Sequence, residues 1–334
     1  MLVLKETKIY IVENILITGI SGQDGIFLAS KYLAKKKYRV FGVSRNKNNQ
    51  KIIHNIKQIS GLNDIEIYID NIDLQNNNLV KEYIYRVNPS TIINFSGPSS
   101  VTKSIVDKVS KDSILIIFDN LINAIAELKD EIVFVQPGSS EMFNLHDTKK
   151  LSETSPMIPK SPYAEAKFEI YNNLIDLREQ RGLRVINTIL FNHESEFRTK
   201  DYLFPKIINA ALNISRKKQK FLRVGSLDMV RDWSFAGDIV NAIDMLIEKK
   251  TYEEYVIGSG VGITIENIIS YVFGYFELDY KKFIEIDPSL LRKDSPQSII
   301  ADPTKINNLG WKPTHDINML LDRCISFKVN STTA

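Results

Sequence analysis

The sequence predicts an α/β protein built on a doubly wound parallel sheet, followed by a smaller α+β C-terminal lobe. Three observations predict this fold class. Short runs of β-branched and other apolar residues recur over the first two-thirds of the chain, helix-like segments lie between them, and the pattern loosens after about residue 200. Strands that alternate with helices are typical of a parallel sheet with crossover connections.

The apolar runs are continuous rather than alternating, as expected for strands covered by helices on both faces. We therefore expect six strands, with helices in several of the segments between them. The expected strands are residues 14–19, 38–44, 65–70, 90–97, 131–138 and 184–192, and the expected helices are residues 25–37, 78–87 and 114–128.

Composition narrows the class of protein. The 334 residues carry a net charge of +3, which does not point to a nucleic-acid partner, and the one cysteine, Cys324, fits a reducing compartment. No apolar window is long enough to span a membrane, and residues 1–13 lack the pattern of a secretion signal. The four histidines are far apart, without metal-ligand spacing. We expect a cytoplasmic protein without a metal ion.

The first expected strand runs directly into "TGISGQDG", which places Gly19, Gly22 and Gly25 in G-x-x-G-x-x-G spacing. Glycines between a strand and a helix allow a tight turn and let the backbone approach a pyrophosphate. The second strand ends in "FGVSRN", with Arg45 where NAD-selective folds usually carry an acidic residue. A cation there suits a 2′-phosphate, so NADP is the expected cofactor; the alternative is that Arg45 is a solvated residue at the end of a strand.

These motifs divide the chain into three parts. Residues 1–13 form an N-terminal extension, and residues 14–192 form a Rossmann-type NADP-binding domain that carries the catalytic residues. Residues 193–330 form mainly a substrate-binding lobe, with some segments that return to the first domain. In such sheets the ligand crevice lies outside the carboxyl ends of the strands.

Tyr163 and Lys167 in "SPYAEAK" are four residues apart and therefore share one face of a helix. A lysine ammonium beside a phenol favours the phenolate, so we expect a lowered tyrosine pKa. Such a phenolate takes a proton from a substrate hydroxyl while hydride leaves the same carbon. Glu141 in "QPGSSEMFN" follows the fifth expected strand, at the end of the sheet where chemistry occurs, and its alternative is a surface charge.

The glycine-rich turn and the Y-x-x-x-K pair are the pattern of the extended short-chain dehydrogenase/reductase family. Within it, the sequence most closely resembles the GDP-mannose 4,6-dehydratases, from Ile15 to about Pro313. The resemblance rests on motifs in the family's order. These are "ILITGISGQDGIFLA", "GSSEMF", "SPYAEAK", "ILFNHES", "VRDWSFAGDIV" and "LGWKP".

The resemblance implies a nucleotide-sugar 4,6-dehydratase acting on a GDP-linked mannose, heptose or amino sugar. Glu141 then removes the C5 proton after C4 is oxidised, and Glu141 with Ser139 helps the C6 hydroxyl to leave as water. Hydride returns to C6. The implied catalytic residues are Ser139, Glu141, Tyr163 and Lys167, and Ser139 also contacts the substrate.

The resemblance also implies binding residues. Asp73 and Leu74 match the adenine side, and residues 95–99 match the loop that lines the cofactor. His193 and Arg231 are also open to purely structural roles. These are a hydrogen bond in the core for His193 and an ion pair with Asp232 or Asp238 for Arg231. The implied cofactor residues are Gly19, Ser21, Gly22, Gln23, Asp24, Gly25, Arg45, Asp73, Leu74, Phe95, Ser96, Gly97, Ser99, Tyr163, Lys167, His193 and Arg198. The implied substrate residues are Ser100, Ser139, Asn192, Lys206, Arg231 and Arg292.

Several positions depart from the family. Pro98 stands where a glutamine is usual beside the nicotinamide and the sugar, and Ser139 stands for a threonine. The family's "SPRRG" is "SEFRT" here, its "TRK" is "FPK", and Ser295 stands for an acidic residue. The loop after Arg45 is also unlike the family's. These changes lie around the sugar and nucleotide ends, so we expect retained chemistry, with the sugar open between mannose, a heptose and an amino sugar.

Two other functions stay open at this point: a 4-reductase or epimerase of a nucleotide sugar, which leaves Glu141 idle, and a catalytically silent NADP-binding protein. The family usually pairs through two long helices, here 114–128 and 163–180, so a homodimer is expected and a tetramer is the alternative. The implied pathway is the synthesis of bacterial surface polysaccharide.

Overall fold

The computed structural model describes residues 12–99, 109–128, 131–143, 150–290 and 296–332. Its centre is a seven-stranded parallel sheet in the order β10-β6-β5-β4-β1-β2-β3, which confirms the predicted fold class. The first six strands match the six predicted runs, and the seventh, β10, is contributed by the C-terminal half of the chain. The strands are β1 (Glu13–Thr18), β2 (Tyr38–Val43), β3 (Ile67–Asp70), β4 (Thr91–Asn94), β5 (Val133–Ser139), β6 (Val185–Leu190) and β10 (Glu254–Ile257).

Helices cover both faces of this sheet, which explains why its strands are apolar along their whole length. One core lies between the sheet and helices α3, α5 and α6, and a second, larger core includes residues of α1, α2 and α8 and continues into the C-terminal lobe. The helices around the sheet are α1 (Gln23–Lys35), α2 (Asn49–Ser60), α3 (Asn77–Val87), α5 (Val109–Leu128), α6 (Pro162–Arg181), α8 (Ala236–Lys249) and α10 (Thr304–Asn308), and the 3-10 turn η1 (Ser140–Met142) follows β5.

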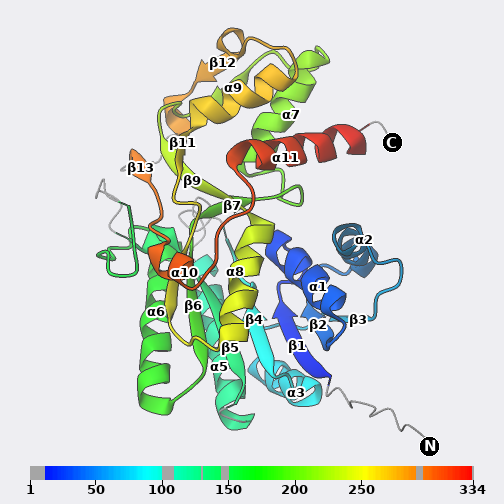
Figure 1. Ribbon diagram of the computed structural model, residues 1–334, viewed down its shortest axis with the longest axis vertical. Coiled ribbons are helices and arrows are strands. Elements are labelled where there is room, and N and C mark those ends of the chain that lie inside the picture. The colour runs from blue at the N-terminus through cyan, green and yellow to red at the C-terminus, as the bar shows by residue number, and fades with distance from the viewer. Residues whose placement is uncertain (1–11, 100–108, 129–130, 144–149, 291–295, 333–334) are drawn as a thin grey trace, which may run out of the picture.

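The C-terminal lobe lies at one end of the sheet (Figure 1). β9 is central to its largest sheet, pairing with β7, β11 and β13, and β8 pairs with β12. The elements of this lobe are β7 (Asn192–Glu194), α7 (Leu203–Ser215), β8 (Leu222–Val224), β9 (Val230–Phe235), β11 (Gly262–Thr264), α9 (Ile265–Tyr275), η2 (Tyr280–Lys282), β12 (Ile284–Ile286), η3 (Pro288–Leu290), β13 (Ser298–Ile299) and α11 (Ile317–Ser331).

The segment after Arg45 was expected to be a loop. This expectation is wrong, because most of the segment forms the helix α2. The side chain of Asn48 caps its first turn by accepting a hydrogen bond from the backbone N–H of Lys51. Ile52 and Ile56, four residues apart, are buried against the core. The helix ends where Gly61 adopts a left-handed conformation.

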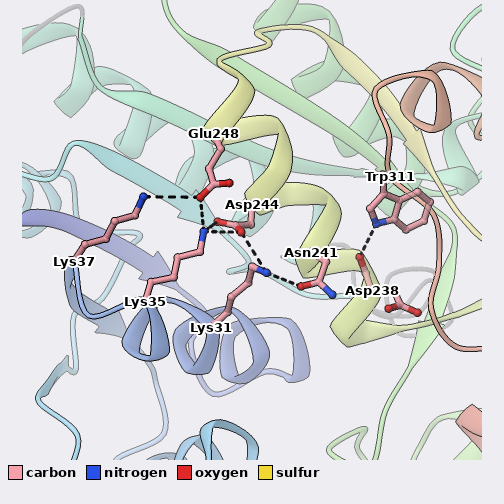
Figure 2. Close-up of polar contacts among 8 residues, drawn as sticks. All are labelled: Lys31, Lys35, Lys37, Asp238, Asn241, Asp244, Glu248 and Trp311. Atoms are coloured by element: carbon pink, nitrogen blue, oxygen red, sulfur yellow. Dashed lines mark hydrogen bonds and ion pairs between the residues drawn. The ribbon is translucent and has the colours of Figure 1, made fainter.

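An ion-pair network joins α1 to α8 (Figure 2). The carboxylate of Asp244 lies 2.6 Å from Lys35 Nζ and 3.3 Å from Lys31 Nζ. Lys35 Nζ also lies 2.7 Å from Glu248. Lys31 and Lys35 therefore attach the C-terminal half of the chain to the first helix of the N-terminal half.

Candidate active site

The glycine-rich turn between β1 and α1 has no room for a side chain at Gly19 or at Gly25. Gly19 has φ +69°, and a Cβ on it would lie 2.6 Å from the carbonyl oxygen of Phe95. A Cβ on Gly25 would lie 2.5 Å from Ile20 Cα. Gly22 is the N-cap residue of α1 and provides no side chain to cap the helix. The first backbone N–H groups of α1 are thus available to an anion such as a pyrophosphate.

The end of β2 places Arg45 in solvent beside the turn that follows it. Ser44 is buried, and its hydroxyl accepts a hydrogen bond from the backbone N–H of Asn46 at 2.9 Å. After β3, Leu74 is buried and its carbonyl accepts a hydrogen bond from Asn120, whereas the Asp73 side chain is exposed and accepts from the backbone N–H of Gln75. These residues follow the two strands at one edge of the sheet.

A row of hydrogen-bonded buried polar side chains, which the sequence analysis did not identify, runs from the carboxyl ends of β1 and β4 to the middle of β5. Thr18 donates to Asn94 at 2.7 Å, and Asn94 donates to Gln136 at 2.8 Å. Gln136 in turn donates to the carbonyl of Pro137, which also accepts a hydrogen bond from Lys167 Nζ at 2.9 Å. The available signal was one polar residue at or near the end of each apolar run. These hydrogen bonds hold β1, β4, β5 and Lys167 together beside the candidate site.

Tyr163 lies in the first turn of α6 because the start of this helix is strongly specified. Ser161 is the N-cap residue, and its hydroxyl accepts a hydrogen bond from the backbone N–H of Ala164 at 3.2 Å. Pro162 at the first helical position has a backbone suited to that place. The helix packs against β5 and η1, so its first turns face the carboxyl end of β5.

The Tyr163 and Lys167 side chains are both 9% exposed, and Lys167 Nζ lies 5.9 Å from the centre of the Tyr163 ring. Burial raises the pKa of Tyr163 to about 12, although Ser139 opposes this rise. Burial also lowers the pKa of Lys167 to about 8. The expected lowering of the tyrosine pKa by the lysine is therefore not seen in this structure, because the largest effect on the pKa of each group is its own burial.

Ser139 and Glu141 lie where β5 ends and the short turn η1 begins. Ser139 is 8% exposed, and its hydroxyl accepts a hydrogen bond from the backbone N–H of Glu141 at 3.3 Å. Ser139 and the negative charge of Glu141 both act on the pKa of Tyr163, Ser139 lowering it and Glu141 raising it. The structure thus brings Ser139, Glu141, Tyr163 and Lys167 together at one strand end.

A second group of side chains connects α1 to the β6–β7 segment. Gln23 is buried; its amide nitrogen donates to the carbonyl of His193 at 3.1 Å, and its amide oxygen accepts from Ser195 at 2.9 Å. His193 Nε2 lies 3.1 Å from the Asp24 carboxylate. Burial alone would lower the pKa of His193, but Asp24 outweighs it and raises the pKa. His193 therefore belongs to a link between the two halves of the chain at the start of α1.

Arg198 continues this link toward the loop after β4. Its Nε lies 3.6 Å from the buried carboxylate of Glu194, and burial raises the pKa of Glu194 to about 7. The Arg198 guanidinium lies 3.6 Å from the centre of the Tyr202 ring, and the Tyr202 hydroxyl lies 2.8 Å from that of Ser99. Ser99 closes the loop of residues 95–99, in which Phe95, Ser96 and Gly97 are partly buried.

The residues expected to bind the nucleotide diphosphate are spread over the C-terminal lobe. Asn192 is in β7 and Arg231 in β9, where Arg231 donates to the carbonyl of Val230 at 2.8 Å. Lys206 is exposed in the first turn of α7. Ser100 and Arg292 lie outside the described residues.

Asp232 and Asp238, the two carboxylates considered as ion-pair partners of Arg231, accept hydrogen bonds from other segments of the chain. Asp232 is buried and accepts hydrogen bonds from the backbone N–H groups of Ser259, Gly260 and Ala301, and from the Ser259 hydroxyl at 2.6 Å. Asp238 accepts hydrogen bonds from Thr314 and from the backbone N–H of His315. Asp232 thus fixes the loop between β10 and β11 next to Arg231.

Over the residues that the structure describes, no cluster of three or more His, Cys, Asp and Glu side chains could hold a metal ion. Within the same residues, no helix is long and apolar enough to cross a membrane.

Comparison with known proteins identifies the relatives of this chain. The sequence model described as GDP-mannose 4,6 dehydratase matches residues 16–324. GDP-mannose 4,6 dehydratase 2 of Arabidopsis thaliana is 33% identical over 307 residues, covering 89% of this chain and 82% of that protein. The GDP-mannose 4,6-dehydratase of Vibrio cholerae is 30% identical over 332 residues, covering 89% of each chain.

Two solved structures share the fold. The dTDP-glucose 4,6-dehydratase DesIV of Streptomyces venezuelae, with NAD and TYD bound, has a TM-score of 0.82 at 20% identity, covering 96% of this chain and 98% of that one. The UDP-glucose 4-epimerase of Bifidobacterium longum, in complex with NAD+ and UDP, has a TM-score of 0.83 at 17% identity, covering 96% and 99%. At these identities the likeness shows the fold alone.

Proposed function

The chain is a member of the GDP-mannose 4,6-dehydratase family, and we propose that it is an NADP-dependent GDP-sugar 4,6-dehydratase, a hydro-lyase. The observation that carries this proposal is the meeting of Ser139, Glu141, Tyr163 and Lys167 at the end of β5. A Tyr–Lys pair serves any oxidation of a sugar hydroxyl. The carboxylate of Glu141 beside it is what the loss of water additionally requires.

The residues around the turn after β1 fit a dinucleotide. Gly19 and Gly25 leave no space for side chains, the start of α1 is uncapped, and Arg45 is exposed at the end of β2. Several of the solved structures with this fold are described with NAD. Arg45 favours NADP here because a guanidinium binds a 2′-phosphate through parallel hydrogen bonds. When bound, the oxidised nicotinamide supplies the hydride acceptor and a positive charge that favours a phenolate.

Tyr163 is the proposed base for oxidation at C4. Its phenolate removes the proton of the C4 hydroxyl as hydride leaves C4, and the product carries a 4-keto group. Lys167 holds its ammonium over the Tyr163 ring and is fixed by the carbonyl of Pro137. Ser139, which lowers the pKa of Tyr163, assists the same proton transfer.

Glu141 is the proposed base and acid for the loss of water. A 4-keto group acidifies C5, so a carboxylate can remove the C5 proton, and the electron pair moves to form the C5–C6 double bond as the C6 hydroxyl leaves. The proton on Glu141 goes to that hydroxyl, which departs as water. Hydride is then returned to C6, a proton from solvent is added to C5, and Tyr163 releases to solvent the proton that it took from the C4 hydroxyl, which yields the 4-keto-6-deoxy sugar without net consumption of cofactor.

Residues 193–330 are proposed to hold mainly the nucleotide diphosphate of the substrate, through Asn192 at their border and through Lys206 and Arg231. Arginine and lysine suit phosphate oxygens by charge and geometry. Asp232 supports this role because its four hydrogen bonds fix the loop beside Arg231. Ser100 and Arg292 complete the proposed substrate set.

The test is mass spectrometry of the protein incubated with NADP and a panel of GDP-, UDP-, CDP- and dTDP-sugars. We expect loss of one water from a GDP-hexose or GDP-heptose, and abolition of that product by Glu141→Gln. Glu165→Gln is the matched control, because Glu165 is an exposed residue of α6 paired with Lys111. A dehydrated product that still forms with Glu141→Gln would contradict the role of Glu141, and a product that retains the water would point to a reductase or an epimerase.

The proposed assembly is a homodimer formed through α5 and α6. A groove of about 230 Å³ lies between the outer faces of these helices and is lined by Phe118, Asn123, Leu177 and neighbouring residues. Ile116 of α5 is 40% exposed. A second copy of the chain would cover this face. Light scattering should give the mass of two chains for the wild type and of one chain for Asn123→Arg. The control Asn78→Arg, on α3, should keep the mass of two chains. A mass of four chains for the wild type would indicate the tetramer.

A further inference from the structure

Tyr202 is a residue that the sequence analysis did not identify and that the mechanism above does not use. It is the N-cap residue of α7, but its side chain makes no capping hydrogen bond. The ring instead reaches the loop after β4, where the Tyr202 hydroxyl lies 2.8 Å from the Ser99 hydroxyl. The side chain therefore spans the distance between the C-terminal lobe and the dinucleotide-binding half at the carboxyl end of the sheet.

The position of this ring is well defined. The Arg198 guanidinium lies over it, 3.6 Å from its centre, and Arg198 Nε lies 3.6 Å from the carboxylate of Glu194, a fully buried residue of β7. A planar cation stacked on an aromatic ring is attractive and restricts both groups. Tyr202 is consequently held by the lobe on one side and by Ser99 on the other.

Tyr202 also lies close to the proposed reacting groups. Tyr202 and Arg198 both act on the pKa of Tyr163, after the larger effects of burial, Ser139 and Glu141. Ser99 is exposed and follows Pro98, which stands where the resemblance implies a glutamine beside the nicotinamide and the sugar. Proline has no side-chain hydrogen-bonding group, so this loop lacks that donor and acceptor at residue 98.

We propose that Tyr202, together with Ser99, is a specificity-determining residue that hydrogen-bonds a ring hydroxyl of the sugar. This inference rests on the proposed function and deepens it. Two hydroxyls bonded to each other still offer one O–H donor and several acceptor lone pairs. Such a pair can accept from, and donate to, a substrate hydroxyl. A site built around a hydroxyl discriminates against an analogue that lacks it, because its own polar groups are then left unpaired.

A purely structural role is the competing explanation, in which Tyr202 only attaches α7 to the loop. The two roles differ in what Tyr202→Phe changes. This substitution keeps the ring and the stacking with Arg198 and removes only the hydroxyl. A structural role would alter stability and affect all substrates alike, whereas a specificity role changes the ratio between two substrates.

The experiment measures kcat/KM for the accepted GDP-sugar and for its 2-deoxy and 3-deoxy analogues, in the wild type and in Tyr202→Phe. We expect the wild type to prefer the parent sugar over one analogue by about tenfold, and Tyr202→Phe to reduce that ratio to about one. The loss should appear in KM more than in kcat. Ser99→Ala should abolish the same preference, which keeps the test valid if Tyr202→Phe folds poorly.

Tyr271→Phe is the matched control, because the Tyr271 hydroxyl donates to Asp322 at 2.8 Å on the far helices α9 and α11. This control should keep the wild-type ratio. If the wild type is active and both Tyr202→Phe and Ser99→Ala keep its kcat/KM ratios between parent sugar and analogues, the specificity role of Tyr202 is overturned. The proposed function itself would still stand. A wild type that dehydrates no GDP-sugar would overturn the proposed function, and the inference with it.

Discussion

Burial shifts the pKa values of three titratable residues in and around the candidate site in the direction that favours their uncharged forms. The pKa of Tyr163 is raised to about 12, that of Lys167 is lowered to about 8, and that of Glu194 is raised to about 7. In such a site the local dielectric constant is low, so the charges of a bound ligand interact more strongly with these groups than they would in water. The proposed proton transfers thus depend on the charges of the bound cofactor and substrate.

Glu194 gives a test of this burial through the pH dependence of stability. Its pKa is about 7 in the folded protein and about 4.5 in an exposed glutamate. Between these values the folded state keeps a proton that the unfolded state has released, so the free energy of unfolding falls as pH rises, by up to about 3 kcal/mol from this group.

Glu194→Gln should remove this slope, so urea denaturation at pH 4.5, 6 and 7.5 should give a flatter profile than the wild type. His193 contributes in the same direction, because its pKa is also raised, but it is present in both proteins. Parallel profiles for the two proteins would show that Glu194 is ionised in the folded state across this range.

Arg45 gives a test of cofactor choice at the same scale. Replacing it with Asp puts a carboxylate where the 2′-phosphate would lie and offers it to the 2′-hydroxyl of NAD. We expect Arg45→Asp to weaken NADP binding by about 10- to 100-fold and to leave or improve NAD binding. Fluorescence titration of NADPH and NADH measures both. Equal weakening of the two cofactors would contradict the role of Arg45.

At the scale of elements, the site depends on where a few strands and helices end. Ser161 and Pro162 start α6 so that Tyr163 lies in its first turn, and Gly22 starts α1 without a capping side chain. Apolar runs and helical spacing are local signals, which is why the elements themselves, but not their exact ends, could be predicted from the sequence. The predicted strands of the main sheet and the helices at 25–37, 78–87 and 114–128 all correspond to elements of the structure, with shifted ends.

The elements that the sequence analysis missed depend on distant contacts. β10 joins the main sheet beside β6 although it lies far along the chain, and a run of four residues gives no signal of its own partner. The chain from Thr18 through Asn94 and Gln136 forms only when three strands lie side by side. Tyr202 depends likewise on the meeting of α7 with the loop after β4. The pKa shifts of Tyr163 and Lys167 could not be predicted from their spacing, because burial is set by the whole fold.

The ion pairs between α1 and α8 predict a loss of stability when Asp244 is replaced. The Asp244 side chain is 6% exposed and lies near two lysines, whereas Glu248 is 48% exposed. Asp244→Ala should lower the free energy of unfolding by about 2 kcal/mol, because it leaves two partly buried cations with one exposed partner. Glu248→Ala, the control, should cost less than about 1 kcal/mol. Equal effects in urea denaturation would mean that burial of Asp244 does not matter.

At the scale of the whole molecule, the two halves of the chain meet at the carboxyl end of the parallel sheet (Figure 1). The link from Gln23 and Asp24 to His193 and Ser195 fixes the lobe to the start of α1. The same end of the sheet carries the proposed catalytic side chains. A cofactor bound along the sheet and a nucleotide sugar bound under the lobe would therefore meet at Ser139, Glu141 and Tyr163, which is the arrangement that hydride transfer between them requires.

In the proposed reaction, hydride leaves C4 and returns to C6 of the same sugar, and one water is lost between the two steps. The most direct measurement is mass spectrometry and NMR of the product from a GDP-hexose labelled with deuterium at C4, with NADP present in catalytic amount. We predict a product that has lost one water, carries the deuterium at C6, and forms in many turnovers per cofactor. A product that keeps the water, or that forms only in step with consumption of NADPH, would contradict the account.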